Sequence, residues 1–169
     1  MFVVQMHGLP GSGKSTVATA LAGETGAIVL DKDIVKSALL RWGLEDRDAG
    51  GASYQVFFDQ AGDLLRRGHS VILDSPVFWA EVERKSHAVA HDAGVPHLLI
   101  QCVCPDEAEL RRRLSERPAL PSQPRSPLEM RRYAGSIEPQ GERLVLDTTR
   151  PLADVLADAV AYVNARLHA

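Results

Sequence analysis

The segment GLPGSGKS, residues 8–15, limits the possible folds of this chain more than any other stretch. It matches the pattern G-x-x-x-x-G-K-[ST] in full. It follows the apolar run MFVVQM (1–6) and precedes a helical pattern of apolar residues over 17–22. Its glycines permit close approach of the backbone to a ligand, and successive N–H groups at a helix start form a concavity that binds anions. The segment therefore predicts a strand–loop–helix unit with an anion-binding loop.

The rest of the chain repeats this alternation of apolar runs and helical patterns. Short, continuous apolar runs suit strands that are buried on both faces of a parallel sheet. Helices between such strands imply right-handed crossovers, so we expect a three-layer α/β/α domain with a five-stranded parallel sheet. The expected strands cover 1–6, 27–30, 70–74, 97–104 and 143–147, and the clearest helices cover about 57–68, 80–93, 106 onward and 152–167.

Length and composition are those of one ordinary globular domain, residues 1–169. The formal net charge of -3 argues against tight, non-specific binding to a nucleic-acid duplex. Apolar runs are shorter than the roughly 18 residues that a membrane helix needs, and the N-terminal segment lacks the pattern of a signal peptide. Cys102 and Cys104 have no companions suited to zinc, so we expect two buried small hydrophobes and a cytoplasmic protein.

One stretch departs from the pattern of strands and helices. Residues 116–129, ERPALPSQPRSPLE, hold four of the ten prolines, which excludes a regular helix or a central strand. A surface loop of this length inside a compact domain is usually functional. We expect a lid over about 115–132 that closes over a bound ligand.

The anion-binding loop has the side chains that a nucleoside triphosphate requires. Lys14 offers a positive charge to the β- and γ-phosphates, and the Ser15 hydroxyl is a ligand for Mg²⁺. ATP or another nucleoside triphosphate, with Mg²⁺, is therefore the expected cofactor pair. The expected nucleotide contacts in this segment are Gly8, Leu9, Pro10, Gly11, Ser12, Gly13, Lys14, Ser15 and Thr16.

Three acids follow the second and third expected strands. Asp31 and Asp33 stand two positions apart in AIVLDKD, and Asp74 ends SVILD. Because ligands gather at the carboxyl ends of parallel strands, these acids are expected near the bound triphosphate, where Asp74 would hold Mg²⁺ directly or through water. The simpler alternatives are that Asp33 caps the following helix and that Asp74 caps the turn before Pro76.

Four motifs in order, GLPGSGKST, LDKD, VILDSP and LRRRLSERP, resemble the small P-loop kinases. This group includes the polynucleotide 5′-hydroxyl kinases, chloramphenicol phosphotransferase, the zeta toxins and gluconate kinase. The resemblance implies a P-loop NTPase fold with the sheet order 2-3-1-4-5. It also implies that Asp33 takes the proton of an attacking hydroxyl while Asp31 belongs to the metal and water network, although the sequence alone allows the two roles to be exchanged.

The same resemblance assigns roles near the C-terminal end of the site. An R-x-x-x-R pair at the start of the lid, Arg113 and Arg117 here, would contact the nucleotide phosphates from one helix face. Its alternative is a solvated basic face. Thr148 would border the adenine, or one of Thr148 and Thr149 would only cap the last helix.

The phosphoryl acceptor is the least defined part. We expect a small molecule with a hydroxyl group, such as an antibiotic, a nucleoside or a metabolite. The alternatives are a polynucleotide 5′-hydroxyl kinase, whose strand-end binding would weaken with salt, and a nucleotide switch or slow ATPase without an acceptor. Six aromatic residues are either core or walls of an acceptor pocket: Trp42, Tyr54, Phe57, Phe58, Phe78 and Trp79. His87 and His91 share a helix face but lack a zinc-protease pattern, so we expect a polar surface there.

Overall fold

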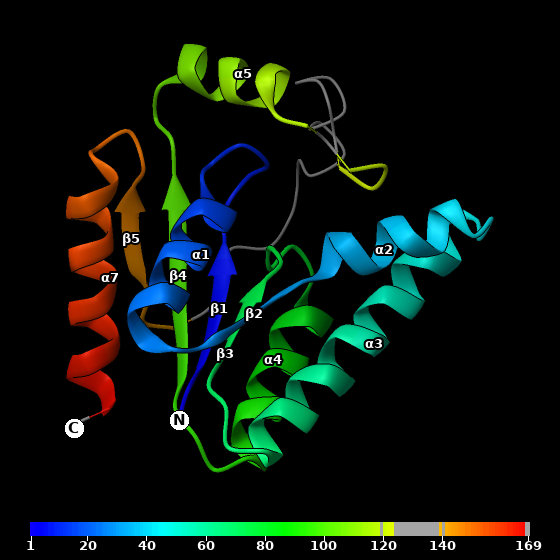
Figure 1. Cartoon of the computed structure of the whole chain (residues 1–169), viewed down its shortest axis with the longest axis horizontal. Coiled ribbons are helices and arrows are strands. Elements are labelled where there is room, and N and C mark those ends of the chain that lie inside the picture. Colours follow the sequence, from blue (N-terminus) through cyan, green and yellow to red (C-terminus); the bar gives the residue numbers. More distant parts are fainter. Residues whose placement is uncertain (119, 124–138, 140, 168–169) are drawn as a thin grey trace.

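A computed structural model describes residues 1–118, 120–123, 139 and 141–167 of the chain. Its centre is a sheet of five strands that all run in parallel, in the order β2-β3-β1-β4-β5 (Figure 1). The predicted fold class and strand order are confirmed. The strands are β1 (Val3–His7), β2 (Ile28–Asp31), β3 (Val71–Asp74), β4 (His97–Val103) and β5 (Leu144–Asp147).

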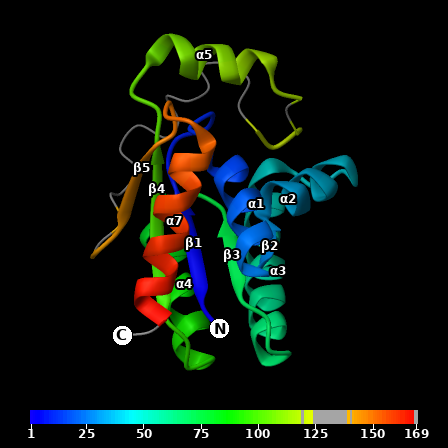
Figure 2. The ribbon, with the colours of Figure 1, turned by 60° about the vertical axis from the view of Figure 1, so that its left-hand side comes forward.

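Helices cover both faces of this sheet and so give the three expected layers (Figures 1 and 2). Two of them, α1 and α7, share one core with the sheet, whereas α3 and α4 share the other. A further helix, α5, lies across the carboxyl ends of the strands (Figure 1). The helices are α1 (Lys14–Thr25), α2 (Lys32–Arg41), α3 (Asp46–Arg66), α4 (Ala80–Asp92), α5 (Glu107–Glu116) and α7 (Leu152–Leu167).

The side chains of the central strand alternate between the two cores. Val4 and Met6 of β1 pack on the side of α1 and α7, whereas Val3 packs on the side of α3 and α4. All three are fully buried. This is the burial on both faces that continuous apolar strands predict.

Local signals in the sequence account for several helix ends. Asp31 caps α2 by accepting a hydrogen bond from the Asp33 backbone N–H, and Asp106 caps α5 in the same manner. Gly68 and Gly94 follow α3 and α4 with positive φ, as the sequence predicts for helices that end in this way.

On α7 the buried residues are Val155, Ala159, Tyr162 and Val163, whereas the terminal residues Leu152 and Leu167 are exposed. One detail of the sequence prediction is wrong. Cys102 is buried as expected, but Cys104 lies beyond the end of β4 and is only partly buried. Much of the expected lid, residues 124–132, lies outside the described residues. Over the part that is described, each helix is either too short or too polar to cross a lipid bilayer.

Candidate active site

A cavity of about 890 Å³ lies at the carboxyl ends of β1, β2 and β3, and side chains of α5 line its other side. Most of the predicted site residues line it. We call residues 10–16 with Asp74 its loop half, and Lys32, Asp33, Tyr54, Phe78 and Trp79 its aromatic half. Gly8, Leu9 and Ser12 are not among its lining residues. The predicted site residues that line it are Pro10, Gly11, Gly13, Lys14, Ser15, Thr16, Asp31, Asp33, Asp74, Arg113, Arg117 and Thr148.

The loop after β1 is a tight backbone structure packed against β4. Gly8 has φ +133°, and a Cβ atom built there would lie 2.2 Å from the Cys102 carbonyl oxygen. Lys14 folds back over the loop, where its Nζ donates to the Gly8 and Leu9 carbonyl oxygens at 2.8 and 2.9 Å. Burial is the main cause that lowers the pKa of Lys14. Two backbone carbonyl groups of the loop therefore hold the Lys14 ammonium group in place.

Helix α5 and the loop after β5 close over the other side of this segment. Leu110 and Leu114 lie against Gly11, and Thr148 lies against Gly13. The Thr148 hydroxyl oxygen is 2.9 Å from the Ser12 carbonyl oxygen. Thr148 thus hydrogen-bonds the backbone of the loop. The sequence, which suggested a position beside the adenine or at the start of the last helix, did not predict this contact.

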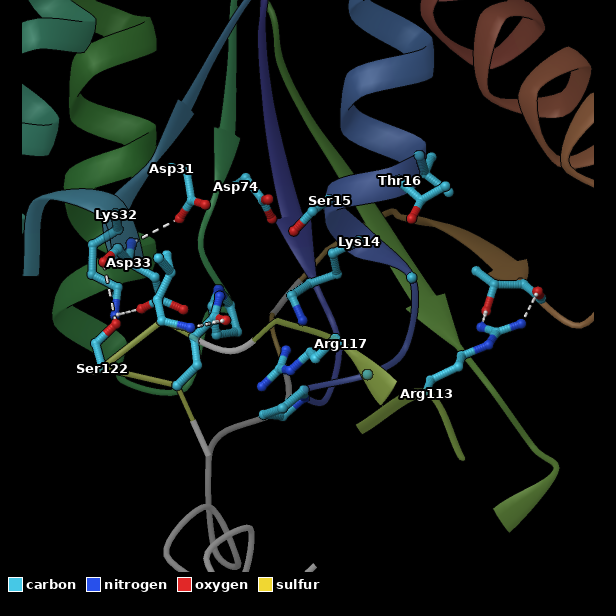
Figure 3. A pocket seen from close by; sticks show the side chains of 18 of the residues that line it. Lys14, Ser15, Thr16, Asp31, Lys32, Asp33, Asp74, Arg113, Arg117 and Ser122 are labelled. Atoms are coloured by element: carbon cyan, nitrogen blue, oxygen red, sulfur yellow. Dashed lines mark hydrogen bonds and ion pairs between the residues drawn. The ribbon is translucent and has the colours of Figure 1, made fainter. Parts of the chain in front are cut away.

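Asp31 and Asp74 are partners in register across β2 and β3, at the carboxyl ends of both strands. Burial, followed by the charge of Asp74, raises the pKa of Asp31 to about 6. Burial also raises the pKa of Asp74, against the opposing effects of Lys14 and a hydrogen bond with the Ser15 side chain. Two buried acids side by side favour a cation or a proton between them. Figure 3 shows Asp74 between Asp31 and Ser15.

Asp33 stands in a different environment, in the first turn of α2. Its carboxylate is 2.5 Å from the Lys32 Nζ. Burial acts to raise the pKa of Asp33, but the charge and hydrogen bond of Lys32 outweigh it and lower the pKa below the usual value. Asp33 is therefore an ionised carboxylate at neutral pH, while one carboxylate oxygen of Asp31 caps α2 by accepting a hydrogen bond from the Asp33 backbone N–H at 2.7 Å. The sequence offered Asp33 as the cap of this helix, but the capping side chain is that of Asp31.

The two arginines at the start of the expected lid do not share a helix face, so that prediction is wrong. Arg117 follows the end of α5 and has an extended backbone, because the next residue is Pro118, which disfavours a helical conformation before it. Its side chain lies beside Lys14 (Figure 3). The Arg113 guanidinium points away from Lys14. It donates to the Thr148 hydroxyl and carbonyl oxygens at 3.0 and 2.9 Å.

Residues just after Arg117 reach the cavity from a direction that the sequence did not indicate. The Ser122 hydroxyl donates to the Asp33 carbonyl oxygen at 3.2 Å, and the buried Ser37 hydroxyl lies 2.9 Å from that of Ser122. The Gln123 side chain hydrogen-bonds the Asp33 carboxylate. These contacts join segments almost 90 positions apart, for which no local pattern gives a signal.

The oxygen atoms of Asp31 and of two residues of the loop half, Ser15 and Asp74, suit a hard cation. Ser15, Asp31 and Asp74 supply only hydroxyl and carboxylate oxygens, the donors that Mg²⁺ prefers, and Mg²⁺ is commonly held by one or two carboxylates together with phosphates and water. Among the described residues, no group of three or more His, Cys, Asp and Glu side chains forms a metal site. His91 is exposed, and His87 stacks on His97 with ring centroids 3.8 Å apart, so the predicted polar face holds a ring contact.

The sheet order and the loop define the fold of the small P-loop kinases. The chain belongs to the protein family described as AAA domain, whose model matches residues 3–136. The Mycobacterium tuberculosis APS kinase CysC, solved with AMPPNP and APS, has 22% identity and a TM-score of 0.71, with 96% of this chain and 97% of that chain covered.

Two further solved structures are similar over nearly their full lengths. A gluconokinase from Sinorhizobium meliloti 1021 has 21% identity and a TM-score of 0.65, with 98% of this chain and 93% of that chain covered. A candidate kinase from Chloroflexus aurantiacus j-10-fl has 22% identity and a TM-score of 0.75, with 98% and 97% covered. No curated protein matches the chain by sequence.

Proposed function

We propose that this protein is a phosphotransferase that moves the γ-phosphate of ATP to a hydroxyl group of a small molecule. The observation that carries the proposal is that one cavity joins the loop half to the ionised Asp33. A kinase needs both parts within one enclosed volume, because phosphoryl transfer depends mainly on positioning and on charge stabilisation. Family membership and the kinase fold support the nucleotide-dependent part of the proposal.

The residues of the loop half would bind and orient the triphosphate. The backbone N–H groups of residues 11–16 and the N-terminus of α1 attract the phosphates, and Lys14 would leave its carbonyl partners to bind the β- and γ-oxygens. Arg117 is the better placed of the two arginines to reach the transferring group. Arg113 would instead hold the Thr148 loop in place.

Asp33 would accept the proton of the attacking hydroxyl as the phosphoryl group leaves ATP. Lys32 keeps its carboxylate ionised, and Ser122 and Gln123 fix its position from the opposite side. Ser15, Asp31 and Asp74 would hold Mg²⁺, which, when bound, offsets phosphate charge during the transfer. This division gives Asp33 the base role and Asp31 the metal role.

The test compares Asp33→Asn with Asp31→Asn in an assay of transfer from γ-labelled ATP. Asp33→Asn should slow transfer by about 10²- to 10⁴-fold, the usual contribution of a general base, with the Kd for AMPPNP nearly unchanged. Asp31→Asn keeps a residue that caps α2, and it should mainly raise the Mg²⁺ concentration needed for half-maximal activity. If Asp33→Asn turned over like the wild type and Asp31→Asn were inactive at every Mg²⁺ concentration, Asp31 would be the base and the proposed assignment of the two roles would be wrong.

The acceptor panel for this assay should contain nucleosides, phenicols, aminoglycosides, sugar acids and 5′-hydroxyl oligonucleotides. Transfer to one of the small molecules supports the proposal. Transfer confined to oligonucleotides and weakened steeply by salt would instead mark a polynucleotide kinase. Label found only as inorganic phosphate, whatever acceptor is added, would mark a slow ATPase.

A further inference from the structure

The aromatic half of the cavity carries information about the acceptor. Six aromatic residues were open to either a core or a pocket role, and the structure separates them. Phe57 and Phe58 of α3 are buried in the core, and Trp42 is 85% exposed and does not line the cavity. The three that remain, Tyr54, Phe78 and Trp79, line the cavity.

These three rings are joined through Trp79, which contacts the other two. Trp79 meets Tyr54 edge to face with ring centroids 6.3 Å apart, and it meets Phe78 in the same way at 6.0 Å. Trp79 nevertheless stays 52% exposed, although the adjacent Phe78 is buried. A large ring that two neighbours hold while much of its surface stays accessible is suited to contact another ring.

The charges around this wall favour a neutral ligand. Lys32 contacts the Asp33 carboxylate and lies over the Tyr54 ring at 5.4 Å from its centroid. Lys36, the other lysine lining this side, is 2.8 Å from an Asp46 carboxylate oxygen. Both lysines are thus already matched to acids, so an anionic group would gain less here than an apolar ring.

We infer that the aromatic half binds an uncharged planar ring, and that the acceptor is an alcohol that carries such a ring. The inference rests on the proposed function for the alcohol, and on the three aromatic side chains for the ring. Lys32 touches both the Tyr54 ring and the Asp33 carboxylate, so a ring stacked on this wall would bring a hydroxyl substituent toward Asp33. An open-chain polyol would leave the exposed surface of Trp79 without a matching partner.

The chain has two tryptophans, so a direct binding test is available. In Trp42→Phe, the fluorescence of Trp79 alone reports on the cavity. We expect saturable quenching by adenosine or chloramphenicol in the presence of AMPPNP, and none by gluconate or glycerol. If neither adenosine nor chloramphenicol quenched the fluorescence, and neither accepted a phosphoryl group, the inference would be overturned.

The kinetic test uses the same two tryptophans as a matched pair. Trp79→Ala should raise the acceptor KM at least about tenfold with kcat nearly unchanged, Trp79→Phe should restore most of it, and Trp42→Ala should change neither. If the enzyme phosphorylated a polyol in an Asp33-dependent manner and Trp79→Ala had no effect, the proposed function would stand. The inference that the acceptor carries a planar ring would then be refuted. Quenching by ring compounds without any phosphoryl transfer would keep the ring site and refute the kinase function.

Discussion

The two halves of the cavity are built in opposite ways. The loop half comes almost entirely from one continuous segment, residues 10–16, and its contacts run through backbone atoms. The aromatic half assembles side chains from α2, α3 and the segment between β3 and α4. A backbone structure tolerates few substitutions, whereas side chains from separate segments are replaced one at a time. The nucleotide site is therefore expected to be general, and the acceptor site particular to this protein.

The largest expected effect comes from Lys14→Ala, which removes the only positively charged side chain of the loop half. Binding of AMPPNP should weaken by at least about tenfold, because each lost interaction of about 1.4 kcal/mol costs a factor of ten. The rate of phosphoryl transfer should fall further, since Lys14 would also stabilise the charge that develops on the phosphate oxygens in the transition state. Calorimetric titration and the labelled-phosphate assay measure the two effects.

Lys85→Ala is the control for charge removal, because Lys85 lies on α4 and does not line the cavity. It should bind AMPPNP as the wild type does. An equal loss of affinity in both variants would show that the overall charge governs binding, and the contrast between the two halves would lose its basis.

The contrast also explains which features the sequence could predict. Periodicity and the G-x-x-x-x-G-K-[ST] pattern are local, so the strands, the helices and the loop half followed from residues close together in the chain. The separation of Arg113 from Arg117 did not follow, because it depends on where α5 ends. The contact of Ser122 with Ser37 depends on the folded chain, and no spacing reveals it.

The aromatic residues make the same point from a different side. Phe57 and Tyr54 stand three positions apart on α3, and the sequence leaves both open to a core role or a pocket role. Only the position of the segment between β3 and α4, which brings Trp79 against Tyr54, distinguishes a cavity wall from a buried face. Burial patterns in a sequence indicate that a side chain faces inward, but not whether it meets protein or ligand.

Because the loop after β1 packs through its backbone, a single methyl group added at Gly8 should destabilise the fold strongly. In Gly8→Ala the new Cβ would meet the Cys102 carbonyl oxygen, an atom of the central sheet that cannot move aside, at a φ that alanine disfavours. The free energy of unfolding should fall by about 2–4 kcal/mol, in the range of overpacking and strain combined. Urea denaturation measures it.

Gly23→Ala supplies the matched comparison. Gly23 is exposed within α1, and a Cβ atom added there would have no other atom within 4 Å outside its own stretch of helix. Replacement there should stabilise the protein by about 0.5–1 kcal/mol, since alanine favours a helix over glycine. If both variants shifted the urea midpoint equally, the tight packing of the loop on β4 would be refuted.

The smallest expected effect tests the side-chain construction of the aromatic half. Ser122→Ala removes the hydroxyl that contacts the Asp33 carbonyl oxygen and Ser37, while the Ser122 backbone N–H keeps its bond to the Ser37 hydroxyl at 3.2 Å. A net hydrogen bond contributes about 0.5–1.5 kcal/mol, so the acceptor KM or kcat should change by roughly two- to tenfold. The Kd for AMPPNP should stay the same, because the loop half is untouched. Ser115→Ala on the exposed side of α5 should change neither quantity. A parallel loss of nucleotide affinity in Ser122→Ala would mean that the two halves act as one unit, and acceptor specificity could then not vary independently of the loop.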